Sequence, residues 1–92
     1  MGIKIEFKSA LKGVTGTQSV NLDRTFNTFE KVIAELLRLY PRLKDEMFYS
    51  DGTLDYAYQV ILNGQRLVWP EDKKVKIKDG DRIILMLFMA GG

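Results

Sequence analysis

The sequence contains no cysteine and no histidine. It therefore offers no thiolate nucleophile, no imidazole base, no disulfide and no zinc site built from the usual ligands. The carboxylates that remain follow helix-surface and turn patterns, and no pair of them stands out as an acid and a base. We therefore expect that the protein is not an enzyme and that it binds no metal or cofactor of its own.

Excess charge of one sign and long apolar runs are also scarce. The formal net charge is only +2, with acidic and basic residues interspersed, so no strong direct binding to nucleic acid is expected. The longest apolar run, Ile83 to Ala90, is far shorter than the roughly 20 residues of a membrane-spanning helix. The amino end lacks a secretory signal pattern. These features predict a soluble cytoplasmic protein with no membrane partner.

What the sequence does contain suits one folded domain. Apolar residues make up 46% and charged residues 28% of its 92 residues, close to the average for globular proteins. In "IKIEFK", residues 3–8, apolar and charged positions alternate, which is typical of a strand with one buried face. Alternation returns in "TQSVNL", residues 17–22, so an antiparallel pair with a longish connection is predicted.

From Phe29 to Tyr40 the apolar positions follow the period of an amphipathic helix. Thr28 is placed to cap the first turn, and Pro41 pushes the residue before it out of helical geometry. The helix should therefore stop at Tyr40. A further short helical turn is predicted within residues 42–48.

The last third of the chain returns to strand periodicity. Asn63-Gly64, the strongest short hairpin signal, separates "YQVIL" from "QRLVW". "KVKIK" predicts a brief edge strand, and a turn at residues 79–81 leads into a final apolar strand. The order of elements predicts an α+β domain, in which a mixed four- to five-stranded sheet carries one main helix on one face.

The final strand predicts an apolar patch on the face that the helix leaves open. Successive strand residues point to opposite faces, so if the odd-numbered positions face the helix, the even-numbered ones emerge on the other side. A contiguous apolar patch marks a docking site, although a covering loop or tolerated exposure remains the alternative. The predicted partner-binding face consists of Ile61, Ile84, Met86 and Phe88.

Three motifs carry a resemblance to a known family. "VILNGQ", "IKDGDRIIL" and the terminal "AGG" resemble the carboxyl half of the small ubiquitin-like sulfur carriers. That family includes the molybdopterin synthase small subunit, the thiamine sulfur carrier, the ubiquitin-related modifier and the archaeal small modifier proteins. The resemblance implies a β-grasp (ubiquitin-like) domain over residues 1–89 and a flexible reactive tail over residues 90–92.

The terminal glycines have a chemical rationale. Glycine has no Cβ and adopts positive φ, so a glycine tail can be threaded into the ATP site of another protein. The resemblance implies that a ubiquitin-activating-type enzyme uses ATP to adenylate Gly92, with Ala90 and Gly91 as the tail. A sulfur donor then gives a thiocarboxylate for tRNA thiolation or cofactor synthesis, or the acyl group is joined to a lysine of a substrate protein.

The branch of the family stays open. Molybdopterin synthase small subunits usually carry two prolines and a valine just before their last residues, whereas this chain has Leu87, Phe88 and Met89. This difference favours the ubiquitin-related modifier branch. One alternative is the small sulfur-carrier subunit of molybdopterin synthase, with its tail inserted in a large synthase subunit. Another is a non-covalent β-grasp interaction domain whose glycines are incidental.

A group of lysines near the predicted edge strand allows two interpretations. They form either a basic edge that steers the protein toward an acidic partner or tRNA, or a solvated edge strand that lysine protects from aggregation. The group comprises Lys73, Lys74, Lys76 and Lys78.

Overall fold

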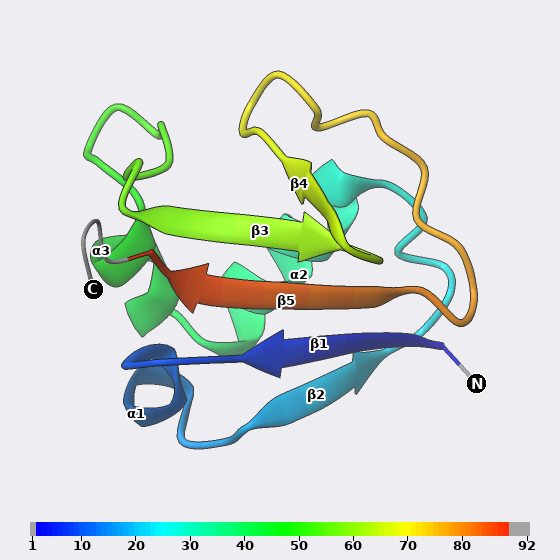
Figure 1. Ribbon diagram of the computed structural model, residues 1–92, viewed down its shortest axis with the longest axis horizontal. Helices are drawn as coiled ribbons and strands as arrows, with labels where there is room; N and C mark the ends of the chain where they lie inside the picture. The colour runs from blue at the N-terminus through cyan, green and yellow to red at the C-terminus, as the bar shows by residue number, and fades with distance from the viewer. Residues whose placement is uncertain (1, 89–92) are drawn as a thin grey trace.

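The computed structural model describes residues 2–88, and Figure 1 looks onto the sheet that they form, with the main helix behind it. The sheet has five strands in the order β2-β1-β5-β3-β4. Only the central pair, β1 and β5, is parallel, so the predicted mixed sheet is confirmed. The strands are β1 Ile3–Phe7, β2 Ser19–Leu22, β3 Tyr58–Leu62, β4 Gln65–Leu67 and β5 Arg82–Leu87.

Helix α2, Phe29–Leu39, is the main helix and forms where its apolar period begins. Thr28 is extended, and its hydroxyl accepts a hydrogen bond from the backbone N–H of Lys31 at 3.2 Å, which satisfies one of the free amides of the first turn. The helix ends just before Tyr40 and Pro41, as predicted. The short helix expected after it is α3, Arg42–Met47.

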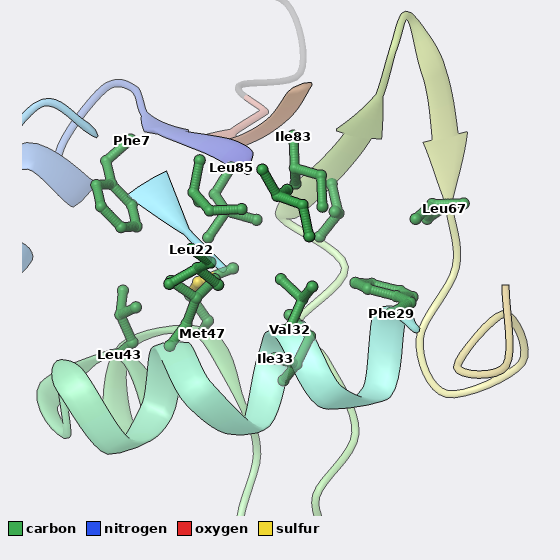
Figure 2. Packing of buried hydrophobic residues seen from close by; sticks show 14 of the residues in the cluster. Phe7, Leu22, Phe29, Val32, Ile33, Leu43, Met47, Leu67, Ile83 and Leu85 are labelled. Atoms are coloured by element: carbon green, nitrogen blue, oxygen red, sulfur yellow. The ribbon is translucent and has the colours of Figure 1, made fainter. Parts of the chain in front are cut away.

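The hydrophobic core lies between α2 and one face of the sheet (Figure 2). Burying each large apolar side chain contributes about 1.5–3 kcal/mol, so this layer supplies most of the stabilisation. Apolar residues of β1, β5 and β3 meet those of α2, and α1 and α3 add their buried residues to the same cluster. Its fully buried members include Ile3, Ile5, Phe7, Leu11, Phe29, Val32, Leu36, Leu43, Met47, Ile83 and Leu85.

The hairpin turn between β3 and β4 fixes where β5 begins. Asn63 and Gly64 have φ values of 48° and 87°, so both central residues have the positive φ of a type I′ turn. The Asn63 side chain donates to the Asp81 carboxylate at 2.9 Å and accepts from the Arg82 backbone N–H at 3.0 Å. The turn therefore joins the end of β3 to the start of β5 through side-chain hydrogen bonds.

Two local predictions differ from the structure. The connection between β1 and β2 contains a short helix, α1 Leu11–Thr15, whose buried residue Leu11 reaches the core. The segment "KVKIK" is not a strand, because its ladder consists of one isolated bridge between Lys76 and Thr28. Ile77 is buried there against the core, so the segment packs on the domain although the predicted strand pairing was wrong.

Candidate functional site

The predicted reacting residues Ala90, Gly91 and Gly92 lie outside the described residues. The structure does show how the chain is held just before them. The Phe88 backbone N–H donates to the Ala57 carbonyl at 2.6 Å, so the chain is still bonded to the sheet four residues before Gly92. Four residues of fully extended chain span at most about 14 Å, which bounds the distance from this anchor to any chemistry at Gly92.

A side-chain hydrogen bond connects this end of the sheet to α3. Tyr58 on β3 pairs with Leu87 on β5, and its hydroxyl donates to the Glu46 carboxylate on α3. Burial raises the pKa of Tyr58, and the neighbouring Glu46 raises it further. The phenol therefore keeps its proton throughout the physiological range and remains a donor to α3.

The four residues of the predicted partner-binding face lie on β3, along β5 and directly after β5. Burial alternates along β5, with Ile83 and Leu85 in the core and the even-numbered positions on the opposite face. Ile84 stands directly opposite Ile61 of β3. Ile61, Ile84 and Met86 are half-buried, whereas Phe88 is 51% exposed. The structure thus brings the four together as an apolar row, and their role in binding stays a prediction.

A charged cluster borders the apolar row on the β1 side. Glu6 is directly opposite Ile84 in the β1–β5 register, and its residue exposure is only 6%. The Arg82 guanidinium binds its Oε1 through two nitrogens at 2.6 and 2.7 Å. Lys8 and Lys4 approach the same carboxylate at 3.5 and 3.7 Å. One buried carboxylate is therefore shared by three cations.

The electrostatics of Glu6 follow from this arrangement. Burial raises the pKa of its carboxyl, but the hydrogen bond and charge of Arg82, followed by the charge of Lys8, outweigh burial and bring the pKa below its ordinary value. Glu6 is thus ionised at neutral pH. A negative charge is tolerated in a nearly inaccessible place because its neighbours are positive.

Sequence reasoning missed this cluster, since it placed Glu6 among the solvated residues of an alternating strand. One signal was available, because lysines two residues before and after Glu6 must share its face of the strand. The third cation, Arg82, is 76 positions away in the sequence. Only the pairing of β1 with β5 brings it to Glu6.

The group of four lysines lies elsewhere, in the loop after β4. The backbone N–H groups of Phe29 and Glu30, at the start of α2, donate hydrogen bonds to the carbonyls of Val75 and Lys73 in this loop. Lys73 also forms an ion pair with Glu30 at 3.8 Å, and the other three lysines are exposed. The loop thus belongs to the amino end of α2. The edge-strand interpretation of the lysines is wrong, because the segment forms no strand, and the steering interpretation stays a prediction.

Other kinds of site leave no trace in the described part of the chain. Within residues 2–88, no three acidic side chains gather in a way that could hold a metal ion. None of the helices in that range has the length and apolar character required to cross a membrane.

Comparison with known proteins rests on structure. No protein-family model and no curated protein sequence matches the chain. Small archaeal modifier protein 1 of H. volcanii superposes with a TM-score of 0.81 and 22% identity over 95% of this chain and 97% of that one. Urm1 from Sulfolobus solfataricus gives a TM-score of 0.69 and 14% identity, over 92% and 99% of the chains.

A third solved structure is named as subunit 1 of a molybdopterin converting factor from Pyrococcus furiosus. It superposes with a TM-score of 0.72 and 17% identity, over 95% of this chain and 97% of its own. In all three cases nearly the whole of both chains is aligned. The five-stranded mixed sheet and its helices therefore have the ubiquitin-like β-grasp fold of the sulfur carriers and protein modifiers.

Proposed function

We propose that this protein is a cytoplasmic ubiquitin-like sulfur carrier and protein modifier that works through the carboxylate of Gly92. The observation that carries the proposal is the combination of a β-grasp fold with a Gly-Gly sequence that begins four residues after the end of its last, central strand. The backbone hydrogen bond of Phe88 supports the proposal, because a partner that binds the sheet has Gly92 only four residues away from that bond.

The chemistry begins on a partner. A ubiquitin-activating-type enzyme joins the Gly92 carboxylate to the α-phosphate of ATP, giving an acyl-adenylate and releasing pyrophosphate. A hydrosulfide equivalent from a sulfur donor then attacks the acyl carbon, AMP leaves, and a thiocarboxylate remains. If a lysine amine attacks instead, AMP leaves, the amine loses a proton, and an isopeptide bond forms. In both branches this chain supplies the acyl group and the partners supply the catalysis.

Intact mass spectrometry tests the proposal. The protein is incubated with ATP and an activating enzyme that is active on its own carrier, with and without sulfide. We expect a species with the mass of the adenylate, and a thiocarboxylate when sulfide is present. A matched control carries one alanine added after Gly92, which displaces the carboxylate from the glycine and should give neither product. Absence of both products from the native chain contradicts the proposal.

The predicted partner-binding face has its own test. Truncating an apolar anchor at an interface removes much of the binding energy, so Phe88→Ala should lower kcat/KM of the activating enzyme for this protein about tenfold, the ratio for about 1.4 kcal/mol. Leu39→Ala is the matched control, because Leu39 is a comparably exposed apolar residue, 37% accessible, on α2. Equal kinetics for the two variants would remove Phe88 from the interface.

A second candidate is the small subunit of molybdopterin synthase. The fold similarity to the Pyrococcus furiosus protein favours it, whereas the apolar residues before the tail favour the modifier. The two proposals differ in what the tail does, because a subunit inserts it permanently into a larger chain. Co-purification as a stoichiometric complex with synthase activity would support the subunit. A free monomer that is adenylated and conjugated would support the modifier.

A plain interaction domain is the remaining alternative. Its function needs only the folded sheet, so deletion of Gly91 and Gly92 should leave partner binding and cellular function intact. The carrier proposal expects that binding survives this deletion while every acyl product is lost.

A further inference from the structure

A hollow of about 200 Å³ opens beside the apolar row, between β1, β2 and α1. Four cationic side chains and one carboxylate line it. Four positive charges and one negative charge leave a net charge of +3 at this place, more than the +2 of the whole chain. The charged residues are Lys4, Lys8, Lys12, Arg82 and Glu6.

Glu6 holds two of these cations in place before any partner arrives. Its side chain is 8% exposed, whereas those of Arg82 and Lys8 are 59% and 53% exposed. The carboxylate thus fixes the inner side of each cation and leaves the outer side open to solvent. Cations that are already ordered lose less conformational freedom when they bind an anion, and this preorganisation favours binding.

The same carboxylate also lacks one hydrogen bond. Among residues 2–88, no donor with hydrogen-bond geometry reaches the buried Oε2 of Glu6. The Lys8 ammonium lies 3.5 Å away, which is an ion-pair distance rather than a good hydrogen bond. A buried acceptor without a donor costs free energy, and the three cations around the carboxylate offset that cost.

The hollow and the apolar row form one surface. Glu6 is opposite Ile84, which in turn is opposite Ile61, so charge gives way to apolar side chains across adjacent strands. Because β1 and β5 are parallel, their carboxyl ends lie at the same end of the sheet, beside α1 and α3 (Figure 1). Lys8 and Lys12 follow β1 at that end, and Phe88 follows β5 there.

We propose that this surface binds an acidic segment of a partner protein. Carboxylate side chains of the segment contact Lys8, Lys12 and Arg82, and neighbouring apolar side chains lie on Ile84 and Met86. A polypeptide offers both kinds of group side by side. Inorganic phosphate and a nucleic-acid backbone provide the negative charge but no apolar contact with the row.

The inference does not depend on chemistry at Gly92, since it concerns binding alone. It adds one element to the proposed function, namely the chemical character of the partner that binds the sheet. The two proposals can therefore be tested separately. If the peptide does not bind, mass spectrometry still shows whether Gly92 is adenylated. If no adenylate forms, the titration still shows whether the peptide binds.

The test is an NMR titration of the ¹⁵N-labelled full chain with short probes. The principal probe is a blocked hexapeptide, Glu-Asp-Leu-Leu-Asp-Glu, and its matched control replaces every acid by the corresponding amide. We expect saturable shifts at the amides of Lys8, Arg82 and Ile84, with a dissociation constant below about 1 mM at low salt and weaker binding as salt is added. The amide control should bind more weakly.

Variants localise the effect. Lys12→Gln and Lys8→Gln should each weaken the acidic peptide by roughly two- to fivefold, the range for an exposed ion pair. Lys12 forms no ion pair within residues 2–88, so its substitution leaves the fold intact. Lys74→Gln removes the same charge from the loop beside α2 and should leave the affinity within about the error of the titration.

Several outcomes would overturn the inference. No saturable shift below about 1 mM, or equal binding of the amide control, would remove the acidic segment as the ligand. Inorganic phosphate or hexauridylate shifting the same amides more tightly than the peptide would assign the hollow to a phosphate group instead. Equal losses from Lys12→Gln and Lys74→Gln would mean that overall charge, rather than this cluster, attracts the peptide.

Discussion

The two faces of strand β5 differ in how fully the fold buries their apolar side chains and balances the charges beside them. On the helix side, Ile83 and Leu85 are at most 1% exposed and packed on every side by the core. On the open side, Ile84 and Met86 are half-buried, and the neighbouring cations outnumber their one carboxylate. One strand thus carries a face that stabilises the domain and a face that stays partly open to solvent, which is where we place the partner.

Truncation of two adjacent residues of β5 should give the largest difference between the two faces. Leu85→Ala should lower the free energy of unfolding by about 2–5 kcal/mol, because it removes a buried side chain and leaves a cavity. Met86→Ala should lower it by less than about 1 kcal/mol, since that side chain is partly solvated in the native state. Urea unfolding of both variants gives the two values. Similar losses would show that the open face is as much a part of the core as the helix side.

A second test concerns the turn that sets the register of β5. Asn63→Ala should cost about 1–2 kcal/mol, because alanine is strained at the positive φ of this position and loses both side-chain hydrogen bonds. Asn63→Gly removes the same bonds without the strain, so we expect a smaller loss, about 1 kcal/mol. Thermal unfolding of the two variants separates the contributions. Equal losses would mean that backbone strain plays no part.

The smallest effect is expected at the charged edge of the open face, where pH is the variable. The pKa of Glu6 is lower in the folded protein than its ordinary value of 4.5. Its ionised form therefore stabilises the fold above about that pH, and this stabilisation is lost as the pH falls through the lowered pKa. Glu6→Gln lacks the titrating group, so its stability should decline less steeply below pH 4.5 than that of the native protein.

Melting temperatures of both proteins, followed from neutral pH into the acidic range, check this prediction. The other carboxylates of lowered pKa, Glu35 and Asp51, are present in both proteins and cancel in the difference. Parallel curves would contradict the role assigned to Glu6.

Much of the fold could be predicted because local signals agreed with tertiary packing. The apolar period of α2, the cap at Thr28 and the Asn63-Gly64 turn each fix an element by interactions within a few residues. The location of the apolar row also followed from the sequence, since alternation along β5 needs only the knowledge that a single main helix covers one face.

The remainder depends on contacts between distant segments. Helix α1 contains Gly13 and is too short to be stable alone, and it exists because Leu11 reaches the core. The segment around Lys76 alternates like a strand but finds no partner strand among the described residues beyond one bridge to Thr28. The Glu6 cluster needs Arg82 from the far end of the chain. None of these long-range contacts has a local sequence signal.

The most direct test of the proposed chemistry at Gly92 is the intact mass of this protein purified from its native cells, with fragmentation to locate any change. The proposal predicts a fraction in which one oxygen of the Gly92 carboxylate is replaced by sulfur, or a fraction joined through Gly92 to a lysine of another protein. Only unmodified carboxylate in cells with an active activating enzyme, or a chain that continues beyond Gly92, would contradict it.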